Sequence, residues 1–223
     1  MGITGTDVTK NVADMVLADD NFATIVSAVS EGRRIYDNIR KAIQFLLGSN
    51  LAEVLSVFTA TVLNFTILKP THLLFINLVT DCVPAIALGV EKPERDIMER
   101  EPRKATDGIF AGGMGVDVIY QGVTVTLLTL AAFFLGEYMS LAPGEVFHWT
   151  NIADCADGMT MAFLTMSMCE IFHSFNMRSQ RRSVFGMMFS GSHNPLLYGA
   201  MLLSLLLTSA VIYVPFLSSA FGF

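Results

Sequence analysis

Charged residues are scarce in this sequence: they make up 15% of its 223 residues, whereas soluble domains carry about 25%. Hydrophobic residues make up 52%, which argues against a water-soluble enzyme domain. Cysteine is also rare. Cys82, Cys155 and Cys169 form no CxxC pair, so neither a disulfide framework nor a cysteine-based zinc site is expected. The four histidines do not cluster, and we expect no histidine metal site.

Long apolar runs are what the sequence does contain. A helix needs roughly 20 apolar residues to cross a bilayer, and five runs approach that length. We therefore predict an all-α polytopic membrane protein with about five transmembrane helices, at residues 42–63, 71–89, 112–135, 155–175 and 195–214.

The first of these helices is predicted to begin well before the membrane. No proline occurs from Phe22 to Leu68, and isoleucine and valine recur at helical intervals between charged residues. A continuous helix of about 40 residues would be about 60 Å long, roughly twice the hydrocarbon thickness. Residues 22–41 are therefore predicted to form a stalk outside the bilayer, and residues 42–223 a transmembrane domain.

Residues 1–21 are polar and do not resemble a membrane segment. Thr6 is a suitable N-cap for a short helix from Asp7 to about Ala13, and Met15 to Ala18 is predicted to be a brief buried strand. One strand and one short helix cannot bury their own apolar faces. We interpret this segment as the edge of a soluble α/β domain.

The positions of the basic residues predict the orientation. Of the 14 Lys and Arg residues, Lys69 alone falls on one side of the predicted spans. The N-terminus, the 91–108 loop and the basic loop with Arg178, Arg181 and Arg182 share the other side. Because cytoplasmic loops are enriched in Lys and Arg, we predict an integral membrane protein with a cytoplasmic N-terminus.

Polar residues inside the first two spans are unusual, because ionisable groups at membrane depth are destabilising. The two spans are joined by a short turn and should be antiparallel neighbours, with comparable depths for the two polar sets. Helical spacing places each set on one face. Their carboxylate, amide and hydroxyl oxygens are ligands that suit Ca²⁺. The predicted cation ligands are Asn50, Glu53, Asn77, Thr80 and Asp81.

Pro84 adds a further oxygen to this prediction, because proline frees the carbonyl four residues earlier, at Thr80. Asn50 alone is also typical of hydrogen bonding between packed membrane helices. Two buried acids repel each other unless they are protonated or neutralised by a cation, so a proton pathway is the alternative to a cation site. Glu170, near the inner end of the fourth predicted span, is interpreted as reaching out to the interface.

Three stretches resemble the C-terminal part of P-type cation ATPases of the calcium-pump class. They are MVLADDNFATIV, SEGRRIYDNIRKAIQFLLGSNLAEV and LLFINLVTDCVPAIALGVEKPERDIMEREPR. The resemblance implies that residues 1–21 end the cytoplasmic phosphorylation domain, that residues 22–41 are its stalk helix, and that the five polar residues above bind the transported cation. In sarcoplasmic-reticulum-type pumps a glutamate is found where this chain has Ser167, so Ser167 is a weaker candidate and one ion per cycle is expected.

The chain contains no DKTGT, TGES or GDGVND motif. The resemblance therefore implies no catalytic residue here, Mg²⁺ and ATP bound by cytoplasmic domains outside this chain, and no ATP hydrolysis by the fragment alone. It implies export of Ca²⁺ across a plasma or inner membrane, with lipid and the other pump domains as partners and no nucleic acid. A proton or monovalent-cation pump of the same superfamily and a non-enzymatic membrane module are the alternatives.

Overall fold

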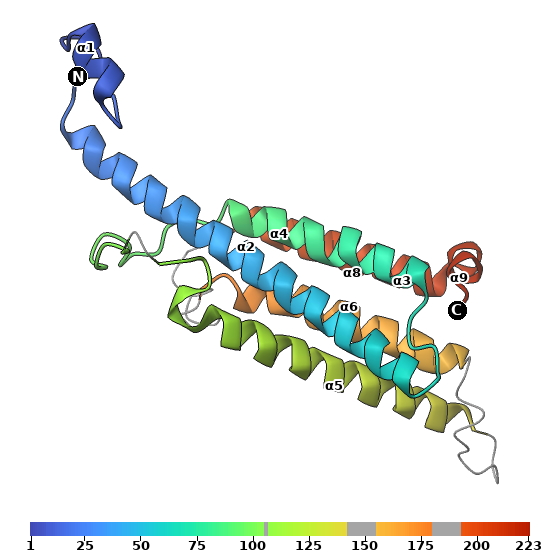
Figure 1. Ribbon diagram of the computed structural model, residues 1–223. Coiled ribbons are helices and arrows are strands. Elements are labelled where there is room, and N and C mark those ends of the chain that lie inside the picture. The colour runs from blue at the N-terminus through green and yellow to red at the C-terminus, as the bar shows by residue number, and fades with distance from the viewer. Residues whose placement is uncertain (105–106, 142–154, 180–192) are drawn as a thin grey trace.

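A computed structural model describes residues 1–104, 107–141, 155–179 and 193–223. These residues form helices and no strand. The longer helices lie side by side in a bundle, and α1 stands apart from it at the far end of α2 (Figure 1). The elements are α1 (Asp7–Val12), α2 (Ala23–Val62), α3 (Pro70–Phe75), the π-helix η1 (Ile76–Asp81), α4 (Cys82–Gly89), the 3₁₀ turn η2 (Ala111–Gly113), α5 (Met114–Ser140), α6 (Ala156–Asn176), α8 (Pro195–Tyr213) and α9 (Pro215–Phe221).

Helix α2 is one uninterrupted helix of 40 residues, as the absence of proline predicts. Its N-terminal turns project from the bundle, and its buried residues begin at Asn38 (Figure 1). The helix ends at Val62, and Asn64 follows with a φ of 61°. Asparagine is among the residues that adopt this left-handed conformation most readily, so the chain can reverse here towards Pro70.

The second predicted span is helical throughout but irregular at its centre. Residues Ile76–Asp81 form a π-helix between α3 and α4, and the Cys82 N–H donates to the Asn77 carbonyl five residues earlier. Pro84 has no N–H and its ring would collide with the Thr80 carbonyl in a regular α-helix. A π-turn is one of the ways in which a helix absorbs such a conflict. The irregularity therefore falls on the segment that carries Asn77, Thr80 and Asp81.

Four helices are long and apolar enough to cross a membrane: Ala23–Val62, Pro70–Gly89, Ala111–Ser140 and Pro195–Tyr213. Helix α6 spans 21 residues in the place of the fourth predicted span but is not among these four. Asp157, Glu170 and His173 lower its hydropathy. The predicted count of five spans is therefore not confirmed, although α6 packs in the bundle against α5.

Two apolar clusters form the core, and polar residues lie between them along the chain. One cluster includes Ile76, Phe163 and Met166, and the other includes Ala85, Leu88 and Met177. Asp81 lies between Ile76 and Ala85 in sequence, and Glu170 lies between Met166 and Met177. Both acidic side chains are buried, so the bundle carries a polar layer in its interior.

The N-terminal segment contains the predicted short helix, α1, with the Thr6 side chain accepting a bond from the Thr9 N–H. The strand predicted for Met15 to Ala18 does not form, so the α/β character of this segment is not confirmed. No neighbouring strand pairs with it among the residues described, and one backbone bond joins the Gly2 N–H to the Leu17 carbonyl at 2.7 Å. The Thr4 hydroxyl and the Ile3 N–H donate to Asp20 and hold the pKa of its carboxyl below its usual range.

Helices α5 and α6 approach each other through glycine. A Cβ added at Gly136 would lie 2.9 Å from the Asp157 carbonyl oxygen and 3.0 Å from the Gly158 Cα. Small residues allow such close backbone contact between membrane helices. We expect Gly136→Ala to lower stability by about 1–3 kcal/mol, the usual effect of overpacking, measured as a lower thermal unfolding midpoint in detergent.

Gly199→Ala in α8 is the matched control, because a Cβ there meets nothing within 4 Å. It should leave the midpoint unchanged or raise it slightly, since alanine favours the helix over glycine by roughly 1 kcal/mol. Equal midpoints for the two variants would contradict a tight α5–α6 contact.

Candidate cation site

Glu53 and Asn77 join α2 to the π-helix. The Asn77 Nδ2 group lies 2.8 Å from Oε1 and 2.7 Å from Oε2 of Glu53, and 3.0 Å from the Leu73 carbonyl oxygen. Glu53 is 7% exposed. The two predicted ligands therefore meet across the helix interface, as the short connection between their spans requires.

Thr80 and Asp81 continue this layer towards α6. Thr80 is fully buried, and its hydroxyl lies 2.9 Å from the Ile76 carbonyl oxygen and 2.7 Å from the Glu170 carboxylate. Asp81 is 1% exposed, and among the described residues neither of its carboxylate oxygens has a hydrogen-bond partner. Its carboxylate lies close enough to Glu53 and Glu170 for the negative charges to repel one another. Three acidic side chains from three elements thus share one interior region.

Asn50 is not brought together with the other four predicted ligands. Its side chain is exposed, and its Nδ2 group donates to the Leu46 carbonyl one turn earlier, at 2.7 Å. A spacing of three residues rotates Asn50 partly away from Glu53, and that rotation is enough to leave it outside the layer. Its role as a ligand stays a prediction.

The interpretation of Glu170 as an interfacial residue is wrong. Glu170 is 2% exposed and bonded to Thr80, and six residues of α6 still follow it before the helix ends at Asn176. Ser167, one turn earlier, is also fully buried, with a hydroxyl that has no partner within the described ranges. The spacing of three between Ser167 and Glu170 was the signal in the sequence that these two share a face.

The chemistry of this layer is that of hard oxygen donors. Glu53, Asp81 and Glu170 are hereafter the carboxylate set, and none of them takes part in an ion pair found among the described residues. Their oxygens suit a divalent cation such as Ca²⁺. No group of three His, Cys, Asp or Glu side chains in the described part of the chain is already arranged to hold a metal ion. Binding a cation here requires the carboxylates to move closer together.

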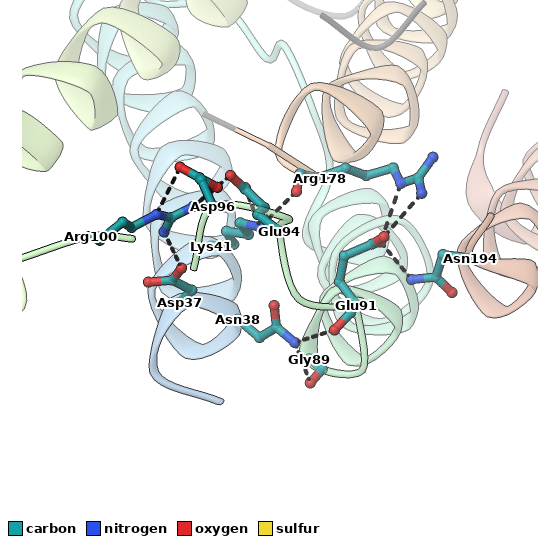
Figure 2. Close-up of polar contacts among 10 residues, drawn as sticks. All are labelled: Asp37, Asn38, Lys41, Gly89, Glu91, Glu94, Asp96, Arg100, Arg178 and Asn194. Carbon is teal, nitrogen blue, oxygen red and sulfur yellow. Dashed lines mark hydrogen bonds and ion pairs between the residues drawn. The ribbon is translucent and has the colours of Figure 1, made fainter. Parts of the chain in front are cut away.

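A second buried polar group closes the end of the bundle nearest α1. Figure 2 shows Arg178 and Asn194 both reaching the Glu91 carboxylate, Arg178 at 3.0 Å and 3.2 Å and Asn194 at 2.8 Å. The Arg178 side chain has no exposed surface and that of Glu91 is 4% exposed. Asn38 of α2 donates to the Glu91 carbonyl at 2.8 Å. The start of the loop after α4, the C-terminal end of α6 and the start of α8 are therefore joined by one set of polar contacts.

Ion pairs tie the loop after α4 to the exposed half of α2. Arg100 pairs with Asp37 at 2.6 Å, with Glu94 at 2.7 Å and with Asp96 at 2.9 Å, while Lys41 pairs with Glu94 at 3.1 Å (Figure 2). The hydrogen bond to Asp96 and the nearby negative charges raise the pKa of Arg100, so it stays charged. These contacts connect the projecting part of α2 to the helices of the carboxylate set.

Comparison with known proteins points to one family. Residues 65–223 match the family described as cation transporting ATPase, C-terminus. The chain is 41% identical to calcium-transporting ATPase 1 of Bacillus cereus, covering 100% of this chain and 25% of that protein. It is 43% identical to the calcium-transporting ATPase of Bacillus subtilis, over 99% of this chain and 23% of that protein.

A plant relative with lower sequence identity is also a calcium-transporting ATPase. Calcium-transporting ATPase 3, endoplasmic reticulum-type, of Arabidopsis thaliana is 35% identical over 94% of this chain and 22% of its own length. The chain thus spans about a quarter of the length of the curated relatives that it matches.

The Glu91 contact should contribute strongly to stability. Glu91→Gln removes the negative charge that faces the enclosed Arg178 guanidinium, and breaking a buried ion pair in this way costs about 3–5 kcal/mol. We expect a clear drop in the thermal unfolding midpoint in detergent. Glu31→Gln is the control, because its pair with Arg34 has side chains 57% and 28% exposed and should contribute under about 1 kcal/mol. Equal midpoints for the two variants would show that the Glu91 contact is not stabilising.

Proposed function

Because this chain belongs to the family of cation-transporting ATPases, we propose that it forms the ion-binding membrane part of an ATP-driven pump, and that the pump exports Ca²⁺ from the cytoplasm. The observation that carries the proposal is the buried pair Glu53 and Asp81, on adjacent helices, with the Asp81 oxygens lacking a hydrogen-bond partner among the described residues. Interior acids without a positive partner need protons or a cation to offset their repulsion.

The ligands in this proposal are Glu53, Asn77, Thr80 and Asp81, with Asn50 and Ser167 as further candidates. Asn77 and Thr80 already contact carboxylates through their polar atoms. A cation that entered would replace those hydrogen bonds: the carboxylate and hydroxyl oxygens would coordinate it, and Asn77 would turn its amide so that Oδ1 faces the ion in place of Nδ2. The π-turn favours cation binding, because an irregular helix at membrane depth can point oxygen ligands at an ion that a regular helix would turn away from it.

Membrane topology completes the proposal. Helix α6 is 21 residues long, about 30 Å at 1.5 Å per residue, which is enough to span the hydrocarbon layer. We infer that it also crosses the membrane, as the fourth of five spans in chain order, with its polar side chains turned into the bundle. Arg178 and the ion-paired loop after α4 would then lie on the N-terminal side, and the excess of basic residues there supports a cytoplasmic location for it. The family supports a plasma or inner membrane. Arg181 and Arg182, part of the charge argument, lie outside the described residues.

Coupling to ATP would run through α2. Residues 1–21 would end the phosphorylation domain, residues 22–41 would be the stalk, and residues 42–223 the membrane domain; Mg²⁺ and ATP would bind in domains that this chain does not include. Glu53 and the projecting turns of α2 belong to the same continuous helix. A tilt of the stalk would therefore move Glu53 relative to Asp81. ATP chemistry in the cytoplasmic domains and cation binding in the membrane would then each change the equilibrium of the other.

Neutral variants of the two acids test the proposal in the intact pump that contains this chain. Asp81→Asn and Glu53→Gln keep side-chain size and remove charge, so each should raise the Ca²⁺ concentration for half-maximal ATPase activity by about tenfold or more. Asp117→Asn is the control, because Asp117 is exposed on α5 and should leave that concentration unchanged.

Two results would contradict the proposal. Unchanged Ca²⁺ dependence in both variants would remove the cation role of the pair. A wild-type pump that responds to pH or Na⁺ but not to Ca²⁺ would favour the proton or monovalent-cation alternative.

A further inference from the structure

A cavity of about 850 Å³ lies between the projecting half of α2 and the loop that follows α4. Its lining combines residues of α2, such as Arg33, with residues of the loop, such as Ile97. Figure 2 shows part of its wall, where Arg100 meets Asp37 of α2. No member of the carboxylate set lines this cavity, so it is separate from the candidate cation site.

Positive charge predominates around the cavity. Six basic side chains line it against four acidic ones, and two of those acids are already paired with Arg100 or Lys41. The two acids that are left, Glu101 and Asp107, cannot offset the remaining four cations. Such a surplus attracts an anion. The four basic side chains of the lining that take part in no ion pair among the described residues are Arg33, Arg40, Arg103 and Lys104.

Neutral groups hold two of these guanidinium groups in place without neutralising them. Arg33 donates to the Ile97 carbonyl at 2.8 Å, and a terminal N–H of Arg40 donates to the Ala111 carbonyl. The Nε of Arg40 is buried and has no hydrogen-bond partner in the described parts of the chain. Arginine groups that are positioned but still lack an anionic partner suit the oxygens of a phosphate group.

Exposed apolar side chains lie next to the cavity, just before α5. Ile109 is 42% exposed and Phe110 is 59% exposed. In the chain they stand between Asp107, which lines the cavity, and Ala111, whose carbonyl Arg40 binds. The helix that follows is apolar enough to cross a membrane. A basic pocket with apolar residues beside it, at the end of a membrane helix, favours a lipid over a ligand dissolved in water.

We propose that this cavity binds the phosphate headgroup of an anionic membrane lipid, held by the four basic side chains without an ion pair, with the lipid tail beside Ile109 and Phe110. A phosphate group is common to lipid headgroups and soluble phosphates, and the apolar neighbours favour the lipid. A bound lipid would join the projecting half of α2 to the loop after α4. The inference goes beyond the proposed function, and it does not require the transported ion to be Ca²⁺.

The test measures lipid binding to the intact pump that contains this chain, purified in detergent. Native mass spectrometry during titration with phosphatidylglycerol, and separately with phosphatidylcholine, gives the dissociation constant of the most tightly bound lipid. We expect phosphatidylglycerol to bind at least about fivefold more tightly, because only its headgroup carries a net negative charge. This preference should decrease as the salt concentration rises.

Two variants remove one positive charge each from the cavity wall. Arg40→Gln and Lys104→Gln should each raise the dissociation constant for phosphatidylglycerol about fivefold and leave that for phosphatidylcholine unchanged. Lys104 is exposed, so its variant should fold even if Arg40→Gln loosens the contact with Ala111. Arg34→Gln is the matched control, because Arg34 lies on the same helix but pairs with Glu31 and does not line the cavity. It should bind both lipids as wild type does.

Three results would overturn the inference. An equal loss in Arg34→Gln and in the two cavity variants would show an effect of general surface charge. Equal affinity of the wild-type pump for the two lipids would exclude a selective site, and this would also be the result if another domain of the pump covers the cavity. Displacement of phosphatidylglycerol by an equal concentration of glycerol 3-phosphate would assign the cavity to a soluble phosphate. None of these measurements involves Ca²⁺, so failure here is distinct from failure of the proposed function.

Discussion

Acidic side chains enclosed without a positive partner are the constraint on which this structure depends. Glu53, Asp81 and Glu170 are each less than a tenth exposed, and the ion pairs found in the described residues all lie elsewhere. The low dielectric that makes a bundle interior stable also penalises every uncompensated charge within it. A protein that keeps three such groups in one layer sacrifices stability there, and a transported cation gives a physical reason for doing so.

The end of the bundle nearest α1 is held in a different way from its middle. Between Arg178, Glu91 and Asn194 every charge has its complement, and the contacts are short. In the carboxylate set, Glu53 is bonded to Asn77 and Glu170 to Thr80, and the Asp81 oxygens have no hydrogen-bond partner among the described residues. A rigid end next to an under-satisfied centre suits an element that must rearrange when an ion arrives.

Much of this architecture was predictable, because it follows from one-dimensional patterns. The absence of proline predicted the long helix α2, and the short connection at Asn64 predicted that Glu53 and Asn77 would meet. Other expectations were wrong or unconfirmed for equally physical reasons. No strand formed at Met15 to Ala18 because a strand needs a neighbouring strand to pair with. Glu170 was wrongly expected at the interface, because the sequence gives its distance from the end of the helix but not which side chains cover it.

The sequence by itself determined the helical membrane class, the family and most of the oxygen donors, since hydropathy, spacing and motif are properties of the chain order. Only the tertiary structure decided which donors face one another. It turned Asn50 outwards, placed the π-turn at Asn77 to Asp81, and set Glu170 against Thr80. Rotation of a helix about its axis and the depth of its packing depend on all of its neighbours at once, and no local pattern encodes them.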